Sequence, residues 1–380
     1  MDFALSKELE MLRKAVREFA EKKIAPNADE WDAKHHFPYK EAIRPMGELG
    51  FFGAVIPEEY GGEGMGFLAA ILISEEIARA SSSLRVQVNM QSLGCAYTIY
   101  TYGSEALRKK YIPKLVSAES LGGFAITEPD AGSDVMAMGS TAEDKGDHWL
   151  VNGSKTWISN AHISDVLIYY AYTDRSKESR GLSAFVLETK NFNGVKTSQL
   201  DKMGSHSSPT GEVFLTDCRI PKENLLGEKG TGFLKLMEKL QQERIIACIG
   251  SVAGAEYMLQ TTIEYCKERI VFGKPLTKFQ HTQFEIVEMA TEIKLGRTFT
   301  DKLIVDHMEG QNVIIETSMA KCWMTDMAFR VADRCLQLHG GYGYCEEYPI
   351  ARAWRDIRVA RIFAGSNEIM KTIAARFMGL

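Results

Sequence analysis

The sequence predicts an α+β protein with three parts: an N-terminal helical domain, a middle β-barrel or sandwich, and a C-terminal bundle of long helices. Helical apolar spacing dominates the start of the chain, short β-leaning segments replace it near residue 120, and helical spacing returns after Pro221. A chain of 380 residues suits two to three domains at ~150 residues each. We therefore expect domains at 1–119, 120–225 and 226–380.

The N-terminal part carries several helical patterns. Ser6 is expected to cap a first helix that runs through Val16 and stops before Pro26, because a serine hydroxyl can accept a free amide of the first turn. Similar apolar spacing predicts further helices, with a Pro- and Gly-rich loop over 57–64. The further helices are expected at 41–50, 68–80 and 87–117.

The middle part alternates short β-prone runs with clusters of Gly, Asn, Asp and Ser, as small barrels and sandwiches do. The C-terminal part shows apolar residues at helical spacing over stretches near thirty residues, which is typical of long antiparallel helices. The expected strands are 121–126, 148–152, 166–172, 182–188, 195–200 and 211–216, and the expected long helices are 232–266, 279–308, 312–339 and 366–377.

Composition excludes several classes of protein. Lys+Arg 45 against Asp+Glu 50 gives a net charge of −5, which offers no electrostatic basis for binding nucleic acid. No apolar run approaches the ~18 residues of a membrane helix, and the first residues resemble neither a signal nor a transit peptide, so a cytoplasmic protein is expected. The 7 cysteines form no C-x-x-C pair, and the 8 histidines form no metal-ligand cluster, so reduced thiols and no metal are expected.

Generic nucleotide and metal motifs are absent. The sequence has no G-x-x-x-x-G-K-[ST], no H-E-x-x-H, and no G-x-G-x-x-G after a predicted strand. The glycines at 340, 341 and 343 end a long helical pattern. They are expected either to cap that helix or to let the backbone approach a ligand closely.

Four segments in order resemble the acyl-CoA dehydrogenase family. They read AITEPDAGSD at 125–134, NGSKTWISN at 152–160, RIVFGKPL at 269–276 followed by Phe279-Gln280, and QLHGGYGY at 337–344 followed by Tyr348-Pro349 and Arg355-Asp356. The resemblance spans nearly the whole chain. It implies the three-domain order above, bound FAD, a homotetramer, and an electron-transferring flavoprotein as acceptor.

The resemblance also implies contacts to FAD and to the acyl-CoA. The flavin ring and ribityl chain can be bound by hydroxyls, backbone amides and an indole. The pyrophosphate of FAD can be bound by a guanidinium, which a neighbouring subunit is expected to supply. The expected flavin-side contacts are Phe124, Ile126, Thr127, Trp157, Ser159 and Ser366; the expected contacts from the neighbouring subunit are Arg269, Phe272, Gln280, Gln337 and Gly341; the expected substrate contacts are Arg85, Ser133, Arg244, Ala364 and Gly365.

Family members remove the α-proton of an acyl-CoA thioester with a carboxylate and pass the β-hydrogen to flavin. The common position of that carboxylate holds Ala364, which cannot accept a proton, although its backbone N–H can still stabilise the thioester oxygen. The sequence thus resembles the isovaleryl-CoA type, whose base precedes an arginine on the long helix, here Glu243 before Arg244. The alternatives are that Glu243 is a solvated helix residue or that the protein is a flavoprotein without a base.

The segment around Arg85 resembles glutaryl-CoA dehydrogenases, in which an arginine at this position binds the distal carboxylate of the substrate. A buried guanidinium without a partner is costly, and a carboxylate can pair with it bidentately. The alternative is that Arg85 pairs with a protein acid, for which Glu75 and Glu76 are candidates, or points to solvent.

Arg85 and Glu243 together predict a branched dicarboxylic substrate. Arg85 implies a distal carboxylate, as in glutaryl-type enzymes, but those enzymes keep a glutamate at the place of Ala364. A base at Glu243 is the isovaleryl-type arrangement, and isovaleryl-type enzymes take branched acyl groups. A 2-substituted succinyl-CoA meets both conditions, with benzylsuccinyl-CoA first and methylsuccinyl-CoA second. The alternatives are a glutaryl-CoA dehydrogenase, or an enzyme for branched or short monocarboxylic acyl-CoA in which Arg85 is structural.

Overall fold

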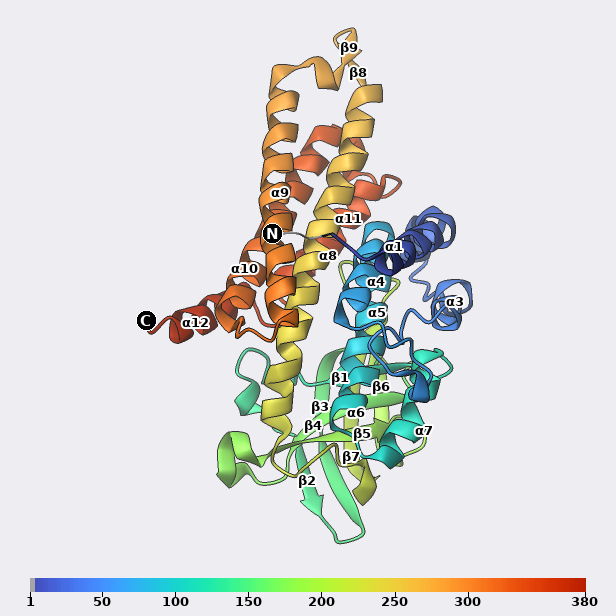
Figure 1. Ribbon diagram of the computed structural model, residues 1–380, viewed down its shortest axis with the longest axis vertical. Coiled ribbons are helices and arrows are strands. Elements are labelled where there is room, and N and C mark those ends of the chain that lie inside the picture. The colour runs from blue at the N-terminus through green and yellow to red at the C-terminus, as the bar shows by residue number, and fades with distance from the viewer. Residues whose placement is uncertain (1–3) are drawn as a thin grey trace.

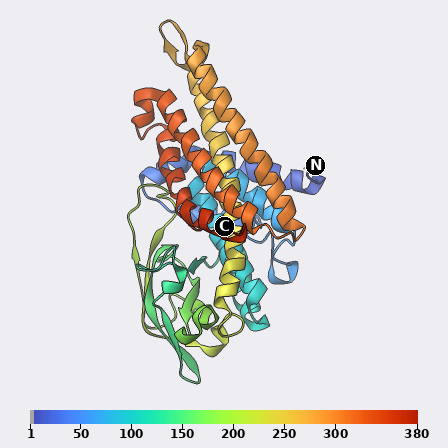
Figure 2. The same ribbon diagram turned by 90° about the vertical axis from the view of Figure 1, so that its left-hand side faces the viewer.

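The computed structural model describes residues 4–380. Its long C-terminal helices run side by side along the longest axis of the molecule, and the β-sheet lies at the opposite end from the β8–β9 hairpin (Ile270–Val271 and Lys274–Pro275) that joins two of them (Figure 1). The N-terminal helices lie beside both regions, as the turned view also shows (Figure 2). The predicted order of helical, β and helical parts is confirmed.

The N-terminal domain is a set of short helices. The hydroxyl of Ser6 accepts the amide of Leu9, so the predicted cap of the first helix is confirmed. The single helices expected at 41–50 and 87–117 are wrong: the first region is a π-helical turn followed by a short helix, and the second is interrupted by a π-helical turn at Met90–Ala96 and by Gly103. The α-helices here are α1 (Lys7–Phe19), α2 (Ala28–Ala33), α3 (Arg44–Glu48), α4 (Phe67–Ala80), α5 (Ser82–Asn89), α6 (Tyr97–Tyr102) and α7 (Glu105–Val116).

The middle domain is a 7-stranded sheet in the order β1-β4-β2-β3-β7-β6, with β5 paired to β4. Six strands are where the sequence predicts them, although β3 and β7 are much longer than expected; β2 is short and was not predicted. β3 and β7 form a long antiparallel pair, and shifts of register interrupt it between Val151 and Gly153 and between Lys155 and Ile158. The strands are β1 (Gly122–Ala125), β2 (Thr141–Asp144), β3 (His148–Ser159), β4 (Val166–Tyr172), β5 (Leu182–Glu188), β6 (Val195–Gln199) and β7 (Thr210–Pro221).

The C-terminal domain is a bundle of three long helices and two short ones. Gly340 ends the third long helix with φ +60°, as expected of a glycine cap. A helix that the sequence analysis did not predict follows, and it begins with Pro349, whose missing N–H costs nothing in a first turn. The helices are α8 (Gly232–Glu268), α9 (Gln280–Met308), α10 (Ile314–His339), α11 (Pro349–Ile357) and α12 (Asn367–Phe377).

The N-terminal and C-terminal helices share one apolar core, whereas each face of the sheet has its own. The shared core contains buried residues of α4, α5 and α8, such as Ile73, Leu84 and Ile249. Since α8 has 37 residues, it is about 55 Å long at 1.5 Å per residue. It extends from the sheet to the hairpin, so a residue in its first half can meet both α5 and the sheet (Figure 1).

Candidate active site

Glu243 lies in the first half of α8 and is buried, with 7% of its surface exposed. The side-chain amide of Asn89, at the end of α5, donates a hydrogen bond to its Oε2. Burial raises the pKa of Glu243 to about 7, while the Asn89 hydrogen bond and the positive charges of Arg85 and Lys239 act in the opposite direction. The alternative of a solvated helix carboxylate is therefore wrong, and this carboxyl group can exchange a proton near neutral pH.

The loop that contains Ala364 is held from two sides. Ala364 has φ +53° and Gly365 has φ +96°, so two successive residues adopt left-handed conformations. Arg244 donates to the carbonyl of Ala364 at 3.2 Å, and Lys321 donates to the carbonyl of Gly365 at 2.8 Å. Within residues 4–380, no group accepts the N–H of Ala364. A fixed loop with a free backbone donor is the arrangement that a developing oxyanion requires.

Arg85 faces α8 from α5 and has 6% of its surface exposed. Its stem crosses Gly250 of α8 so closely that a Cβ there would lie 2.7 Å from Cδ of Arg85. The guanidinium carbon lies 5.8 Å from the centroid of the Phe363 ring, next to the Ala364 loop. Burial lowers the pKa of Arg85 to about 10, and the negative charge of Glu243 acts in the opposite direction.

The acids that could have neutralised Arg85 are engaged elsewhere. Glu76 pairs with Arg17 at 2.7 Å, and Glu75 pairs with Arg297 at 2.8 Å. In the part of the chain that the structure describes, no side chain forms a hydrogen bond or ion pair with the Arg85 guanidinium. The alternatives of a pairing with Glu75 or Glu76 and of a solvent-facing arginine are wrong, and a buried cation is left for a ligand.

A narrow internal cavity joins Glu243 to the sheet. It lies between the helices around α6, the strand β1 and the first half of α8, and most of its lining is apolar. The lining includes Phe124 and Ile126, which the resemblance implies as flavin contacts, together with Glu243. The other lining residues are Gly94, Thr98, Tyr170, Leu236, Lys239 and Leu240.

Trp157 stands out from the bulge between Lys155 and Ile158 on β3, with φ +60° and 62% of its surface exposed. Bulges of this kind redirect a side chain and are frequent beside active sites. The carbonyl of Thr127 accepts the N–H of Thr156 at 2.9 Å, so the loop after β1 is tied to this bulge. Ser159 ends the same strand, half-buried. The loop that carries Thr127 is therefore held beside the bulge that carries Trp157, and Ser159 follows Trp157 by two residues on β3.

A buried ion pair secures the same loop. Nζ of Lys155 lies 2.7 Å from a carboxylate oxygen of Glu128, the residue after Thr127, and both side chains are buried. Glu128 also accepts the amides of Gly139 and Ser140. Breaking a buried pair of this kind leaves an uncompensated charge, so the pair holds the Thr127 loop in one position.

Arg269, Gln337 and Gly341 line a cavity of about 510 Å³ at the far end of the bundle, together with Tyr265 and Tyr342. The hairpin that carries the other predicted contacts is beside it: Phe272 is 92% exposed, and Gln280 begins α9 with its side chain in solvent. This end of the molecule is opposite to the sheet, in which β3 carries Trp157 and β1 leads into the loop of Thr127 (Figure 1). One chain therefore does not bring the two groups of predicted FAD contacts together.

Two further predicted residues lie apart from Glu243. Ser133 is exposed in the loop after the turn from Glu128 to Ala131. The Ser366 hydroxyl accepts the amide of Ile369 at 3.4 Å and caps α12, so it has a structural partner. The roles of Ser133 in binding CoA and of Ser366 in binding FAD stay predictions.

Two residues that were not predicted from the sequence, Asn89 and Lys239, also face Glu243. Asn89 follows Arg85 by four residues on the same helix, and Lys239 precedes Glu243 by four on its own, so both share a face with a residue already singled out. Lys239 is half-buried, its Nζ lies 3.9 Å from the ring centroid of Tyr97, and burial lowers its pKa to about 7. Helical spacing from Arg85 and Glu243 was the signal that could have found them.

Neither a metal centre nor a membrane segment appears in the described residues. Across 4–380, no cluster of three or more His, Cys, Asp or Glu side chains is arranged to hold a metal ion. Among the helices of the same residues, none is both long and apolar enough to cross a membrane.

Comparisons with known proteins agree with the fold. The chain matches the N-terminal domain of acyl-CoA dehydrogenases over residues 6–119, the middle domain over 123–218 and the C-terminal domain over 230–379. It is 58% identical to a glutaryl-CoA dehydrogenase of Desulfococcus multivorans over 378 residues, which cover 99% of this chain and 97% of that protein. The domain boundaries at 119 and 225 stay a prediction.

Solved structures give the same result. The structure of a glutaryl-coenzyme A dehydrogenase in complex with glutaryl-CoA has a TM-score of 0.97 and 58% identity, covering 100% of this chain and 97% of that one. A chain in the structure of the electron transferring flavoprotein of Acidaminococcus fermentans has a TM-score of 0.96 and 38% identity, covering 100% and 99%. The chain therefore belongs to the acyl-CoA dehydrogenase family, whose members are FAD-dependent oxidoreductases that act on a CH–CH bond.

Proposed function

We propose that this protein dehydrogenates a dicarboxylic acyl-CoA, with glutaryl-CoA as the favoured substrate. The observation that carries the proposal is Arg85, a buried guanidinium without a protein partner on the helix that faces Glu243. A monocarboxylic acyl chain would leave this buried cation unpaired. A distal carboxylate would neutralise it with short, charge-assisted hydrogen bonds.

The combination of Arg85 and Glu243 predicts benzylsuccinyl-CoA as the substrate. The comparisons favour glutaryl-CoA instead. The 58% identical relative is a glutaryl-CoA dehydrogenase, and the 58% identical solved chain is described in complex with glutaryl-CoA. Benzylsuccinyl-CoA and methylsuccinyl-CoA have no such support. The presence of Ala364 distinguishes this chain from the glutaryl pattern described above, so the assignment of the base to Glu243 is part of the proposal.

In the proposed reaction, Glu243 takes the α-proton of the bound thioester, and the N–H of Ala364 stabilises the negative charge that develops on the thioester oxygen. Arg244 and Lys321 hold the loop that presents this N–H. Arg85 fixes the far end of the acyl group, which orients the α-carbon toward Glu243. Bound FAD supplies the acceptor for the hydride from the β-carbon.

The residues present fit FAD, provided that a second copy of the chain contributes to each site. The exposed indole of Trp157 offers an apolar plane beside Thr127, and the cavity at Arg269 offers a guanidinium and the backbone of Gly341 to a pyrophosphate. Because these two regions lie at opposite ends of one chain, a neighbouring subunit must supply the second, in accordance with the expected homotetramer (Figure 1).

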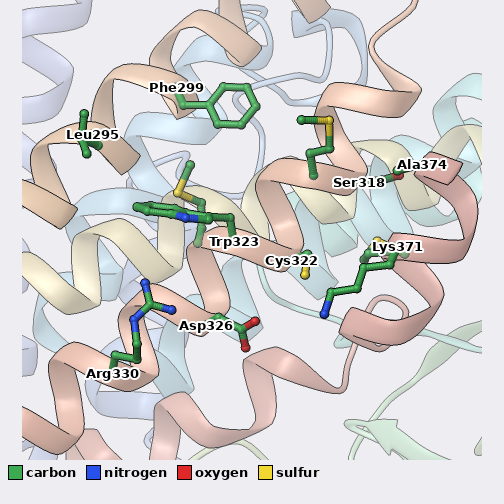
Figure 3. A pocket seen from close by; sticks show the side chains of 12 residues that line it. Leu295, Phe299, Ser318, Cys322, Trp323, Asp326, Arg330, Lys371 and Ala374 are labelled. Atoms are coloured by element: carbon green, nitrogen blue, oxygen red, sulfur yellow. The ribbon is translucent and has the colours of Figure 1, made fainter. Parts of the chain in front are cut away.

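An apolar surface on the bundle is the second support for such an assembly. Helices α9, α10 and α12 enclose an open cavity of about 480 Å³, into which Phe299 and Trp323 project, with Asp326, Arg330 and Lys371 around them (Figure 3). Leu295 and Met319 beside it are about half exposed. We infer that another copy of the chain covers this surface, because α9 also begins at the hairpin that would reach a neighbouring FAD.

An electron-transferring flavoprotein is the proposed acceptor. Support comes from the 38% identical chain in the solved structure of an electron transferring flavoprotein.

Anaerobic titration of the FAD-bound protein with glutaryl-, benzylsuccinyl-, methylsuccinyl-, isovaleryl- and butyryl-CoA tests the proposal, with flavin absorbance as the readout. We expect glutaryl-CoA to bleach the flavin, and the monocarboxylic thioesters to do so weakly. Bleaching by isovaleryl- or butyryl-CoA alone would make Arg85 a structural residue and refute the proposed substrate class. Binding of every thioester without bleaching would indicate a flavoprotein that has lost its base.

A further inference from the structure

Asn89 has an unusual hydrogen-bonding state for a buried amide. It is 6% exposed, its Nδ2 donates to Oε2 of Glu243, and its Oδ1 has no partner within residues 4–380. The reversed amide would turn Oδ1 toward Glu243, and two acceptors would repel each other whenever Glu243 is ionised, so the donor faces the carboxylate in that state. A buried acceptor without a partner is costly, and such groups in folded proteins call for an explanation.

The groups that face Glu243 come from three elements. Arg85 and Asn89 lie on α5, Lys239 lies one turn earlier on α8, and the Tyr170 hydroxyl lies on β4, where the charge of Glu243 contributes to a raised pKa of that tyrosine. Neither cation comes close enough for a salt bridge within the described chain. Asn89 is thus the one group in residues 4–380 that forms a hydrogen bond with the carboxylate.

Resting on the function proposed above, we propose that Asn89 is a positioning residue: its amide N–H fixes one oxygen of Glu243 and stabilises the ionised form that accepts the substrate proton. Burial alone favours the protonated carboxyl, which cannot act as a base. A hydrogen bond to the charged form opposes burial, and it leaves the other carboxylate oxygen available for the substrate. The unpaired Oδ1 is the cost of presenting the N–H at this position.

The experiment measures the rate of flavin reduction by glutaryl-CoA against pH, by anaerobic stopped flow on the FAD-bound protein. The wild type should show a rate that rises with pH and levels off above a midpoint near the Glu243 pKa of about 7. Asn89→Leu keeps the branched shape of the side chain and removes the donor. Since a hydrogen bond to a charged group moves a pKa by about one to two units, the midpoint should rise by that amount and the rate at pH 7 should fall roughly five- to fiftyfold.

Two further variants make the outcome decisive. Asn89→Asp replaces the donor with a second carboxylate of the same shape, so its midpoint should rise at least as far, and it gives a second reading if Asn89→Leu does not fold. Gln87→Leu is the matched control: Gln87 is another buried amide on α5, but it bonds Ser208 at 3.0 Å and should leave the midpoint unchanged.

Three results would have distinct meanings. A rate lowered equally at every pH, with an unchanged midpoint, would make Asn89 purely structural and overturn the inference. A loss confined to the affinity for dicarboxylic thioesters would assign Asn89 to the substrate carboxylate and also overturn it. Undiminished flavin reduction by Glu243→Gln would instead refute the proposed base, whatever the Asn89 variants show.

Discussion

Replacing Arg85 by leucine tests the substrate class most directly. The change removes the guanidinium but retains apolar volume against Gly250 and Phe363. Losing one partner of a buried, hydrogen-bonded charge pair costs about 2–5 kcal/mol. At 1.4 kcal/mol per factor of ten, kcat/KM for glutaryl-CoA should fall roughly 30- to 4,000-fold. The value for butyryl-CoA should fall far less, because a butyryl chain has no carboxylate to lose a partner and is affected only through the higher Glu243 pKa that loss of the Arg85 charge causes.

The same substitution should not destabilise the ligand-free fold. Burial lowers the pKa of Arg85 from 12.5 to about 10, which corresponds to roughly 3 kcal/mol of unfavourable desolvation for the charged form. Leucine has no such penalty, so the thermal midpoint of the variant should equal or exceed that of the wild type. A large fall in the midpoint would mean that Arg85 forms a stabilising contact and would contradict the description of an unpaired cation.

The assay is steady-state oxidation of glutaryl-CoA and butyryl-CoA by wild type, Arg85→Leu and a control, Arg79→Leu. Arg79 is also a partly buried arginine, but it pairs with Glu75 at 3.0 Å and with Glu256. Its loss should lower stability and leave the ratio of the two kcat/KM values unchanged. Equal losses for both thioesters in Arg85→Leu would refute the reasoning, because they would show that the guanidinium does not recognise the distal carboxylate.

Three other predictions concern the same two regions. Because the folded protein raises the Glu243 pKa from 4.5 to about 7, it binds more protons than the unfolded chain between these values, so its stability falls as pH rises through that window. Glu243→Gln should abolish flavin reduction. In denaturant titrations at pH 8, the same variant should have a free energy of unfolding that is higher by up to about 3 kcal/mol. An unchanged free energy of unfolding would contradict the burial of an ionised group. In Gly250→Ala, the new Cβ would lie 2.7 Å from Cδ of Arg85 and should displace the guanidinium. This change should reduce kcat/KM for glutaryl-CoA by about tenfold to a hundredfold and have little effect on butyryl-CoA. Equal effects on both thioesters would argue against a role of Arg85 in binding the distal carboxylate. Arg269→Ala should weaken FAD binding by roughly ten- to a hundredfold, measured as flavin retained on gel filtration, while the circular dichroism spectrum stays unchanged; full retention would exclude a pyrophosphate contact.

Regular periodicity was the part of the fold that sequence alone could predict. The long helices were predicted within a few residues, because their apolar stripes extend over many turns. Strand β2 escaped prediction because Thr141–Asp144 has four residues and one buried side chain, Ala142. Helix α11 escaped because it follows a glycine-rich turn, although Pro349 at its start was a usable signal.

The site was predictable where a residue type was unusual for its place and not where packing decides. Ala364 in a position that commonly holds a carboxylate drew attention to Glu243, and the resemblance of the surrounding segment to glutaryl-CoA dehydrogenases drew attention to Arg85. The spacing of Asn89 from Arg85 places both on one face of α5, but only the crossing of α5 and α8 brings the Asn89 amide to a carboxylate 154 residues away. Trp157 likewise has no sequence signal for its left-handed bulge, which depends on the register of β3 and β7.

The charges in the pocket connect the proposed base with the proposed substrate. Arg85 and Lys239 both act on the carboxylate of Glu243, and burial disfavours the charged form of all three. Lys239 also interacts with Glu238, and its pKa of about 7 means that it carries its positive charge only part of the time at neutral pH. With Glu243 ionised and Lys239 protonated, an excess of positive charge remains, and a second carboxylate from the substrate would balance it. When the α-proton then moves to Glu243, negative charge moves from the base to the thioester oxygen near the free N–H of Ala364, so the total charge of the pocket stays constant. A monocarboxylic thioester would leave the excess uncompensated throughout. The same arrangement that makes Glu243 a usable base therefore also favours a substrate with a distal carboxylate.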